Sequence, residues 1–308
     1  MTKVTSAHYV FEELGEGLHA AISRPDGYGI CNSGVVDLGE GGLVFDTGLT
    51  PVSARDLRDH AEKLLRRPLS LAVCSHRHLD HYLGNSEFSA VPIWSTRRTR
   101  EILLDTKDEQ RAEVTRAQLE KDLSELEGYR PKVHTEEQRS DFEFNLQIYR
   151  ALLAAAAELR PVPPTHPFDT KLVLPGHRGA ELLSFGSGHT EGDALLFLPR
   201  EKVLFAGDLL VVGEQPSMGS ADPEHWLTVL DEIERLRPER IVPGHGPVTD
   251  PDGIEGTRSY ISAVLEAAHS SPRKKLLPAA VRRFEGSVTL DGNLRATREW
   301  LAARKSRG

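Results

Sequence analysis

The chain has 308 residues, of which 39% are hydrophobic and 27% charged, a composition typical of a globular protein with one large domain or two ordinary ones. The formal net charge of −8 disfavours nucleic-acid binding through the protein's general field. No stretch approaches the ~20 apolar residues of a membrane helix, and the N-terminus lacks the pattern of a secretory signal. The two cysteines, Cys31 and Cys74, lack disulfide-framework or C-x-x-C spacing. We therefore expect a cytoplasmic protein that binds neither a membrane nor a nucleic acid.

The first third of the chain predicts short strands followed by a helix. Apolar runs separated by glycines occupy residues 8–14, 18–23, 30–38 and 42–46, which is the pattern of a β-meander. Thr50 offers an N-cap and Pro51 a proline at the first helical position, and apolar residues at helical spacing continue until Pro68. Residues 69–74 and 91–94 predict two further strands, with Cys74 packing in the first of them.

From about Arg97 to Arg160 the composition changes to dense mixed charge, which predicts a helical insertion. Leucines at 119, 123 and 126 have helical spacing, and Thr135 and Gln138 have the spacing of a capping box at the start of a second helix. A solvated helix face is the simplest interpretation of the charges. We predict that this insertion forms a wall of the substrate pocket or a homodimer contact, with decoration of the outer layer as the alternative, and that Phe142, Phe144 and Tyr149 supply the contacts.

Strand-like segments resume after the insertion, at residues 171–175, 180–186, 193–199 and 202–208. A helix is expected at 222–237, a brief strand at 241–242, and C-terminal helices within about 256–304. Two strand-rich parts, each with helices, indicate an α/β layered sandwich in a single domain over residues 1–308.

Histidine carries the strongest chemical signal. The loop after residues 69–74 contains His76, His78, Asp80 and His81 within six positions. Imidazole nitrogens and carboxylate oxygens are ligands of Zn and Fe, and a loop at a strand end can turn several such side chains inward. Solvated loop histidines are the alternative interpretation, which so dense a cluster makes improbable.

Three later signals follow other predicted strands. They are His189 in Gly-His-Thr, Asp208 in Ala-Gly-Asp, and His245 in Gly-His-Gly. Each is weak alone, since an isolated His or Asp is more often structural. All three nevertheless lie where loops leave strands, which is where sites are usually built. The other histidines, including His134, His166 and His177, lack ligand spacing and are expected to be surface or packing residues.

These motifs together resemble the metallo-β-lactamase superfamily of metallohydrolases. The resemblance comprises Asp46 in Val-Phe-Asp-Thr-Gly, H-x-H-x-D-H at 76–81, G-H-T at 188–190, Asp208, and G-H-G at 244–246, all in order. It implies an αββα four-layer sandwich with a dinuclear site at one sheet edge. It also implies two divalent metal ions, most simply Zn, with Fe or Mn as alternatives, and a metal-bound hydroxide as nucleophile.

The resemblance further implies a division of the ligands. Asp46 would fix an imidazole tautomer from outside the ligand set, a role for which Asp193 and Thr190 are also candidates. The implied ligands are His76, His78 and His189 for the first metal, Asp80, His81 and His245 for the second, and Asp208 as the bridge.

The predicted catalytic residues are Asp80, Asp208 and Tyr82. Asp208 resembles the glyoxalase II and lactonase branch, because antibiotic-hydrolysing members generally have Cys or Ser near this position. The C-terminal part, however, lacks an evident basic cluster for glutathione. Tyr82 follows the cluster where most relatives have a small residue, so its phenol could donate to an oxyanion or pack under the loop.

Several functions are compatible with these motifs. The leading hypothesis is a dinuclear hydrolase of a small ester, lactone, thioester or related acyl substrate. The alternatives are a mononuclear iron oxidoreductase of the persulfide dioxygenase type, a β-lactam hydrolase, a phosphodiesterase and a non-catalytic binding protein. The scissile bond depends on pocket walls, which come from loops that motifs do not describe.

Overall fold

The N-terminal part of the chain forms an eight-stranded sheet whose strands lie side by side in chain order. Strands β1 to β5 are antiparallel, and β5 to β8 are parallel. Their bounds are β1 (Lys3–Thr5), β2 (Tyr9–Gly15), β3 (Leu18–Ser23), β4 (Ser33–Asp37), β5 (Gly42–Phe45), β6 (Leu69–Val73), β7 (Ile93–Thr96) and β8 (His166–Phe168). This computed structural model describes residues 3–106, 109, 111, 113–270 and 277–306, so small parts of the predicted insertion and C-terminal segment lie outside the described residues.

A second sheet has five strands in the order β13-β12-β11-β10-β9. Its neighbours are antiparallel except for β12 and β13, which are parallel. The bounds are β9 (Lys171–Val173), β10 (Glu181–Leu183), β11 (Leu195–Leu198), β12 (Val203–Val211) and β13 (Arg240–His245).

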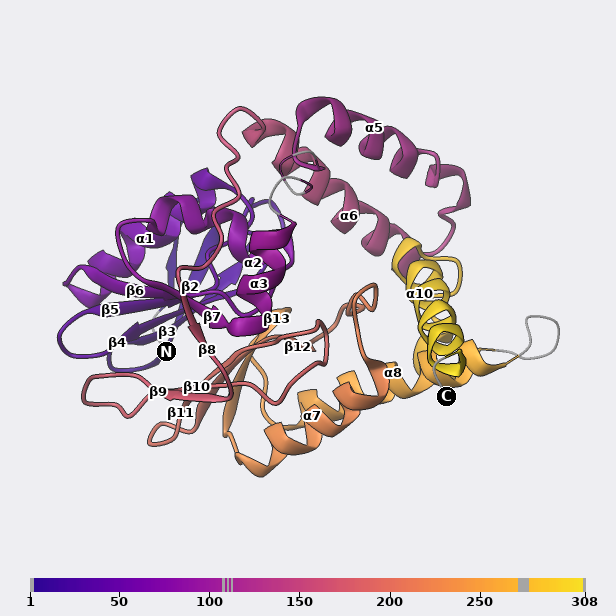
Figure 1. Cartoon of the computed structure of the whole chain (residues 1–308). Coiled ribbons are helices and arrows are strands. Elements are labelled where there is room, and N and C mark those ends of the chain that lie inside the picture. Colours follow the sequence, from indigo (N-terminus) through magenta and orange to yellow (C-terminus); the bar gives the residue numbers. More distant parts are fainter. Residues whose placement is uncertain (1–2, 107–108, 110, 112, 271–276, 307–308) are drawn as a thin grey trace.

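Helices cover the outer face of each sheet (Figure 1). The helices before the second sheet are α1 (Pro51–Leu65), α2 (Leu79–Tyr82), α3 (Arg97–Asp105), α5 (Arg116–Glu127) and α6 (Glu136–Ala155), with short 3-10 turns at Leu83–Phe88 and Arg130–Lys132. The later helices are α7 (Pro223–Arg235), α8 (Asp252–His269), α9 (Ala279–Arg282) and α10 (Val288–Lys305). No helix among the described residues is long and apolar enough to cross a membrane.

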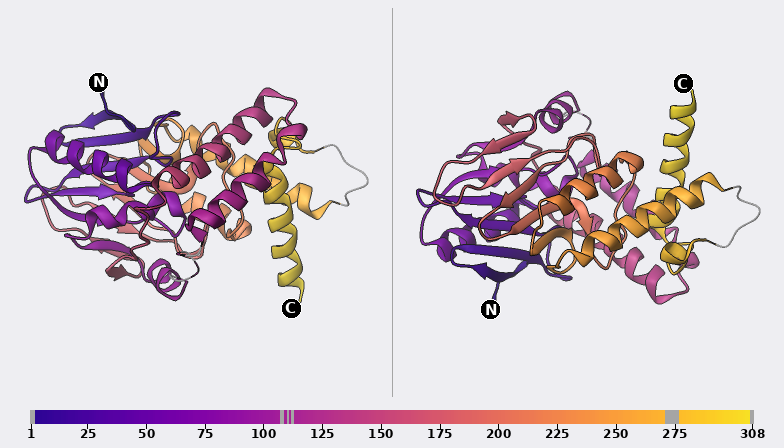
Figure 2. Two further views of the ribbon diagram at one scale, coloured as in Figure 1. Left: turned by 90° about the horizontal axis from the view of Figure 1, so that it is seen from above. Right: turned by 90° about the horizontal axis from the view of Figure 1, so that it is seen from below.

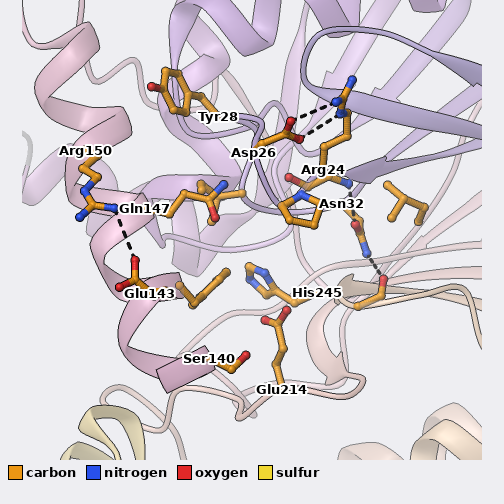
Figure 3. Close-up of a pocket in the computed structure, with 16 residues that line it drawn as sticks. Arg24, Asp26, Tyr28, Asn32, Ser140, Glu143, Gln147, Arg150, Glu214 and His245 are labelled. Atoms are coloured by element: carbon orange, nitrogen blue, oxygen red, sulfur yellow. Dashed lines mark hydrogen bonds and ion pairs between the residues drawn. The ribbon is translucent and has the colours of Figure 1, made fainter. Parts of the chain in front are cut away.

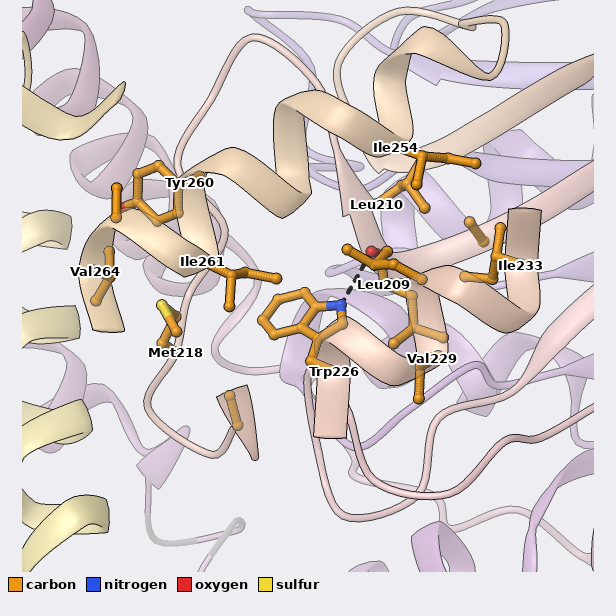
Figure 4. Close-up of a cluster of buried hydrophobic side chains, with 14 of the residues drawn as sticks. Leu209, Leu210, Met218, Trp226, Val229, Ile233, Ile254, Tyr260, Ile261 and Val264 are labelled. Atoms are coloured by element: carbon orange, nitrogen blue, oxygen red, sulfur yellow. Dashed lines mark hydrogen bonds between the residues drawn. The ribbon is translucent and has the colours of Figure 1, made fainter. Parts of the chain in front are cut away.

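Three apolar layers hold the sandwich together. Between the sheets, Phe45 of β5 and Phe205 of β12 bring their ring centroids within 6.1 Å. Leu57 and Ala61 of α1 are fully buried against the first sheet. Trp226 of α7 is buried against the second sheet, and its Nε1 donates to the Leu209 carbonyl at 3.2 Å, which satisfies its polar atom (Figure 4). The predicted αββα four-layer sandwich is confirmed.

The predicted insertion is helical, and its capping box forms as expected. Thr135 accepts from the Gln138 backbone N–H at 3.2 Å, and Gln138 Oε1 accepts from the Thr135 N–H at 3.1 Å. α5 packs against α6 through buried Leu126 and Phe142. The N-terminal part of α6 contacts the start of α10, so that the insertion joins the C-terminal helices (Figure 2).

Some predicted bounds were too short. β12 continues beyond Asp208 to Val211, and β13 includes His245, so neither ligand candidate follows its strand as expected. The β12–β13 register shifts on either side of Gly207, whose φ of 50° is left-handed. Such an irregularity redirects a side chain without ending the strand, which explains why the signal at Asp208 looked like a strand end. The first of the C-terminal helices, α8, likewise begins at Asp252, before the expected residue 256 or so.

Candidate metal centre

The predicted ligands come together where the two sheets meet at one edge. His76 lies in the loop after β6, and His78 is the N-cap of α2, which carries Asp80 and His81. The remaining ligand candidates come from the second sheet: His189 from the loop between β10 and β11, Asp208 from β12 and His245 from the end of β13. Residues more than a hundred positions apart in the chain therefore form one cluster.

The cluster has two groups of donor atoms. In the first group, His76, His78, His189 and Asp208 place one ligand atom each within 4.8 Å of one another. His189 Nε2 lies 2.8 Å from His78 Nδ1 and 3.3 Å from Asp208 Oδ2. Asp208 Oδ2 is also 3.9 Å from His76 Nε2.

The second group consists of Asp80, His81 and His245, again with donor atoms within 4.8 Å. Asp80 Oδ2 lies 3.4 Å from His81 Nε2 and 3.2 Å from His245 Nε2. The other carboxylate oxygen of Asp208, Oδ1, faces this group at 3.1 Å from His81 Nε2 and 3.4 Å from His245 Nε2. Asp208 thus presents one oxygen to each group.

Side chains outside the cluster orient its imidazoles. Asp46 Oδ2 lies 2.8 Å from His81 Nδ1, and its carboxylate accepts from the Ser75 N–H at 2.7 Å and the Ser75 hydroxyl at 2.8 Å. Ser75 Oγ is also 2.9 Å from His76 Nδ1. Asp46 therefore lies where the sequence analysis placed it, outside the ligand set and next to an imidazole. Its contact with Nδ1 of His81 leaves Nε2 of the same ring to face the cluster.

Two positioning residues were missed from the sequence. Ser75 stands directly before His76, so its proximity could have been noticed. Ser220 Oγ lies 2.8 Å from His78 Nε2 across 142 positions, and no local pattern marks it.

Asp193 and Thr190, expected to fix an imidazole, contact each other instead. The Thr190 hydroxyl donates to Asp193 Oδ1 at 2.6 Å and the Thr190 N–H donates to Oδ2 at 3.0 Å. Burial raises the pKa of the Asp193 carboxyl to about 7. The contact between Thr190 and Asp193 stabilises the loop that carries His189, and it does not orient the imidazole ring of His189.

Burial controls the protonation of the first group. Desolvation lowers the pKa of His189 to about 3, that of His78 to about 4, and that of His76 well below its ordinary value. Burial opposes ionisation of Asp208, but His245, His81 and His189 outweigh it and hold its pKa well below the usual range. The three histidines are therefore neutral beside a carboxylate, which is the state in which they bind a metal.

The cluster fits divalent metal ions. His76 Nε2, His81 Nε2 and Asp208 Oδ1 are buried and have no hydrogen-bond partner among the described residues. Buried polar atoms without partners are costly, and here they converge with other nitrogen and carboxylate donors. Nitrogen and oxygen donors in this number suit Zn, Fe or Mn.

The structure places Tyr82 in the apolar core under the insertion. Its side chain is fully buried and packs in a cluster that includes Leu49, Cys74 and Leu83. Burial raises the pKa of its phenol far above the usual value. Packing under the loop is the interpretation that this environment favours, and a catalytic role for Tyr82 stays a prediction. Cys74 is buried in the same cluster, as expected for a packing residue.

The remaining histidines stay outside the cluster. His134, His166 and His177 are exposed, as predicted.

A cavity of about 610 Å³ opens beside His245 (Figure 3). The insertion supplies one wall through α6, and Phe144 lies on that wall with its ring centroid 5.7 Å from that of His245. Phe142 and Tyr149 do not line it: Phe142 is buried between α5 and α6, and Tyr149 packs partly buried beside it. The prediction of a pocket wall therefore holds for Phe144 alone, because residues on one helix point in different directions.

Curated proteins are similar to part of the sequence. A metallo-beta-lactamase type 2 from Bacteroides fragilis is 31% identical over 87 residues, which are 27% of this chain and 35% of that protein. A beta-lactamase-like protein 2 homolog from Caenorhabditis elegans is 32% identical over 104 residues, or 34% of this chain and 32% of that protein. The chain therefore matches about a third of the length of these relatives.

Solved structures share the fold. The metallo-beta-lactamase DIM-1 superposes with a TM-score of 0.56 and 17% identity, covering 83% of this chain and 97% of that one. A metallo beta lactamase from Erythrobacter litoralis gives a TM-score of 0.57 and 16% identity, covering 85% and 99%. The family profile described as metallo-beta-lactamase superfamily matches residues 26–245, which include every predicted ligand. Because this match covers most of the chain and the fold agrees, the chain belongs to the metallo-beta-lactamase superfamily.

Proposed function

We propose that the chain is a dinuclear metal-dependent hydrolase of a small ester, lactone, thioester or related acyl compound. The observation that carries this proposal is the position of Asp208. Its Oδ2 lies 3.3 Å from His189 Nε2 in one donor group, and its Oδ1 lies 3.1 Å from His81 Nε2 in the other. A carboxylate with one oxygen toward each group is suited to bridge two cations.

The proposed ligands match those that the sequence implied. When bound, divalent ions would lower the pKa of water towards neutrality and polarise an acyl oxygen. The first ion would be held by His76, His78 and His189, the second by Asp80, His81 and His245, with Asp208 shared, and Zn is proposed ahead of Fe or Mn.

The chain's own residues prepare this site by orientation and by exclusion of water. Asp46 accepts from His81 Nδ1 and leaves Nε2 directed into the cluster. The two donor groups are closed to solvent on the side of His189 and His81, which have no exposed surface. On the other side, His245 borders the cavity. A substrate entering from the cavity would therefore reach the cluster from the His245 side.

A substrate panel tests the proposed class. The purified metal-loaded protein should hydrolyse members of a series of lactones, carboxylic esters and thioesters, and reversible chelation should abolish that activity. Turnover confined to phosphodiesters, or activity that persists in metal-free protein, would contradict the proposal.

Replacement of the shared carboxylate tests the dinuclear centre. Asp208→Ala removes an anionic ligand from both groups, so we expect activity to fall by about 100-fold or more and metal content, measured by elemental analysis, to drop from two ions per chain. His166→Ala is the control, because His166 is exposed on β8 and should retain both ions. Two retained ions and normal turnover in Asp208→Ala would exclude the bridging role.

β-Lactam hydrolysis is a second candidate. It is favoured by the similarity to the Bacteroides fragilis protein named metallo-beta-lactamase type 2, which is 31% identical over 87 residues. Penicillin and cephalosporin substrates in the same panel would separate the two candidates, since a lactamase would prefer them to the esters and thioesters.

Two further parts of the proposal concern setting and partners. We propose a cytoplasmic enzyme with a small-molecule substrate and no nucleic-acid or membrane partner. The net charge of −8 supports the absence of a nucleic-acid partner, because a nucleic acid is itself negatively charged. A homodimer through the helical insertion is also proposed, as the other role expected for this segment besides a cavity wall. Sedimentation equilibrium of the full chain tests it, and a monomer mass at micromolar concentration would contradict it.

A further inference from the structure

The cavity beside His245 has charged walls, and most of these charges are paired. In the loop after β3, Arg24 donates to Asp26 twice, from Nε to Oδ1 at 3.2 Å and from Nη2 to Oδ2 at 3.1 Å. On α6, Arg150 Nη1 lies 3.5 Å from Glu143 Oε2. Each cationic wall residue is therefore next to an acidic one.

Glu214 is the exception among the charged wall residues. It lies in the loop after β12 and has no hydrogen bond or ion pair with any residue that the structure describes. Its side chain is exposed, and its carboxylate points towards the His245 ring (Figure 3). Desolvation raises the pKa of the Glu214 carboxyl and the neighbouring His245 lowers it, so the cavity has a carboxylate without a hydrogen bond or ion pair next to the proposed reaction site.

Aromatic rings stand in the same cavity. Phe144 of α6 lines it, with its ring perpendicular to that of His245 at 5.7 Å between centroids, and Tyr28 lines the same cavity. An aromatic face attracts a cation through its quadrupole, and a carboxylate attracts it through its charge. Together these groups form a wall with the chemistry of a receptor for an ammonium group.

We propose that the substrate is an acyl ester or thioester that carries a cationic nitrogen, and that Glu214 is the residue that selects for this charge. The proposal rests on the hydrolase function proposed above. The ammonium group would lie near the Glu214 carboxylate, where the Phe144 ring also attracts it, and the acyl group would lie towards the proposed metal ligands. A substrate with a carboxylate at that place would meet an unpaired like charge and be disfavoured.

Three acetyl thioesters of similar size test the selection. They are acetylthiocholine, which is cationic, S-(3,3-dimethylbutyl) thioacetate, its neutral counterpart, and S-acetyl-3-mercaptopropanoate, which is anionic. Thiol release gives kcat/KM for each with the metal-loaded enzyme. We expect the order cationic, neutral, anionic, and we expect Glu214→Gln to reduce the cationic-to-neutral ratio about fivefold, as for an exposed ion pair.

Glu143→Gln is the matched control. It removes the same charge from the same cavity, but Glu143 already pairs with Arg150, so the cationic-to-neutral ratio should change by less than about twofold. Metal content and unfolding midpoint are measured for both variants. Equal changes in the ratio for the two variants, or no change in Glu214→Gln, would overturn the assignment to Glu214.

A binding measurement separates this proposal from the hydrolase proposal. If none of the three thioesters is hydrolysed, thioester hydrolysis is contradicted, and titration calorimetry with benzyltrimethylammonium then decides the recognition of the cation. Weaker binding to Glu214→Gln than to Glu143→Gln supports the selection of a cation by Glu214. Equal binding to both variants contradicts it.

Discussion

The proposed binding of a metal ion through His78 Nδ1 requires that the His78 ring be held in one orientation. Its Nδ1 lies 2.8 Å from His189 Nε2 in the first donor group, while its Nε2 lies 2.8 Å from Ser220 Oγ. A hydrogen bond at the outer nitrogen fixes both the tautomer and the ring plane of a metal-binding histidine. Ser220 therefore orients the imidazole ring of His78 in the same way that Asp46 orients the ring of His81.

Removal of the Ser220 hydroxyl should weaken the metal site without removing a ligand. We expect Ser220→Ala to reduce metal affinity about 10-fold to 100-fold, because His78 can then rotate or change tautomer. Competition with a chromophoric chelator measures this affinity. The exposed Ser217 lies on the same loop, and Ser217→Ala should leave the affinity unchanged. Equal affinities in the two variants would contradict the role of Ser220.

At the scale of elements, helix α6 has two tasks. One face packs into the molecule through buried Phe142 and Leu146, and another face lines the cavity through Phe144 and Gln147. Gln147 Nε2 donates to the Gly27 carbonyl at 2.7 Å, which connects α6 to the loop on the opposite wall. The insertion thus lines the cavity beside His245 and is not a separate decoration.

Substitutions of Phe142 and Phe144 distinguish the packing role of α6 from its role in lining the cavity. Phe142 is 1% exposed, so Phe142→Ala should lower the free energy of unfolding by about 3–5 kcal/mol through loss of buried contacts. Phe144→Ala should cost less stability because its ring is only partly buried, and it should change kcat/KM because the ring faces the cavity.

Chemical denaturation and steady-state kinetics measure both effects, and each variant is the control for the other. If Phe144→Ala left the kinetics unchanged, α6 would be a structural cover only.

At the scale of the whole molecule, the candidate metal ligands connect the two sheets. His76 and Asp80 follow β6 of the first sheet, whereas Asp208 and His245 lie on strands of the second sheet and His189 lies in the loop between two of its strands. Ions that bind these groups would therefore link the halves of the sandwich, and they would bind the folded state alone, since the unfolded chain does not hold the ligands together.

Metal removal should accordingly lower thermal stability. At a free metal concentration of 100 times Kd, each bound ion contributes about 2.7 kcal/mol, which for 308 residues corresponds to a Tm decrease of roughly 4 °C per ion on complete chelation. Scanning calorimetry with and without chelator measures this decrease, and added metal should reverse it. Asp208→Ala should show a smaller decrease, because part of the site is already lost. Equal Tm values for metal-loaded and metal-free protein would contradict a structural link.

Several features followed from the sequence alone. The helix start at Thr135 was predictable because a capping box involves only residues three positions apart. The candidate ligands at 76–81 were visible because a short loop brings close residues together whatever the rest of the chain does. The layered sandwich followed from alternating strand and helix patterns, which local hydrophobicity records.

Other features depended on the tertiary structure. The contact between Ser220 and His78 joins positions 142 residues apart, and no local pattern encodes such a pairing. Phe142 and Phe144 are equally apolar, but successive helical residues turn by about 100°, so only the partners of α6 decide which one faces the cavity. Glu214 likewise lacks an ion pair because folding places acids beside Arg24 and Arg150, whereas the described residue beside Glu214 is His245, a proposed metal ligand. Local chemistry thus determined the ligand types and the elements, whereas long-range packing determined their orientation and the character of the cavity.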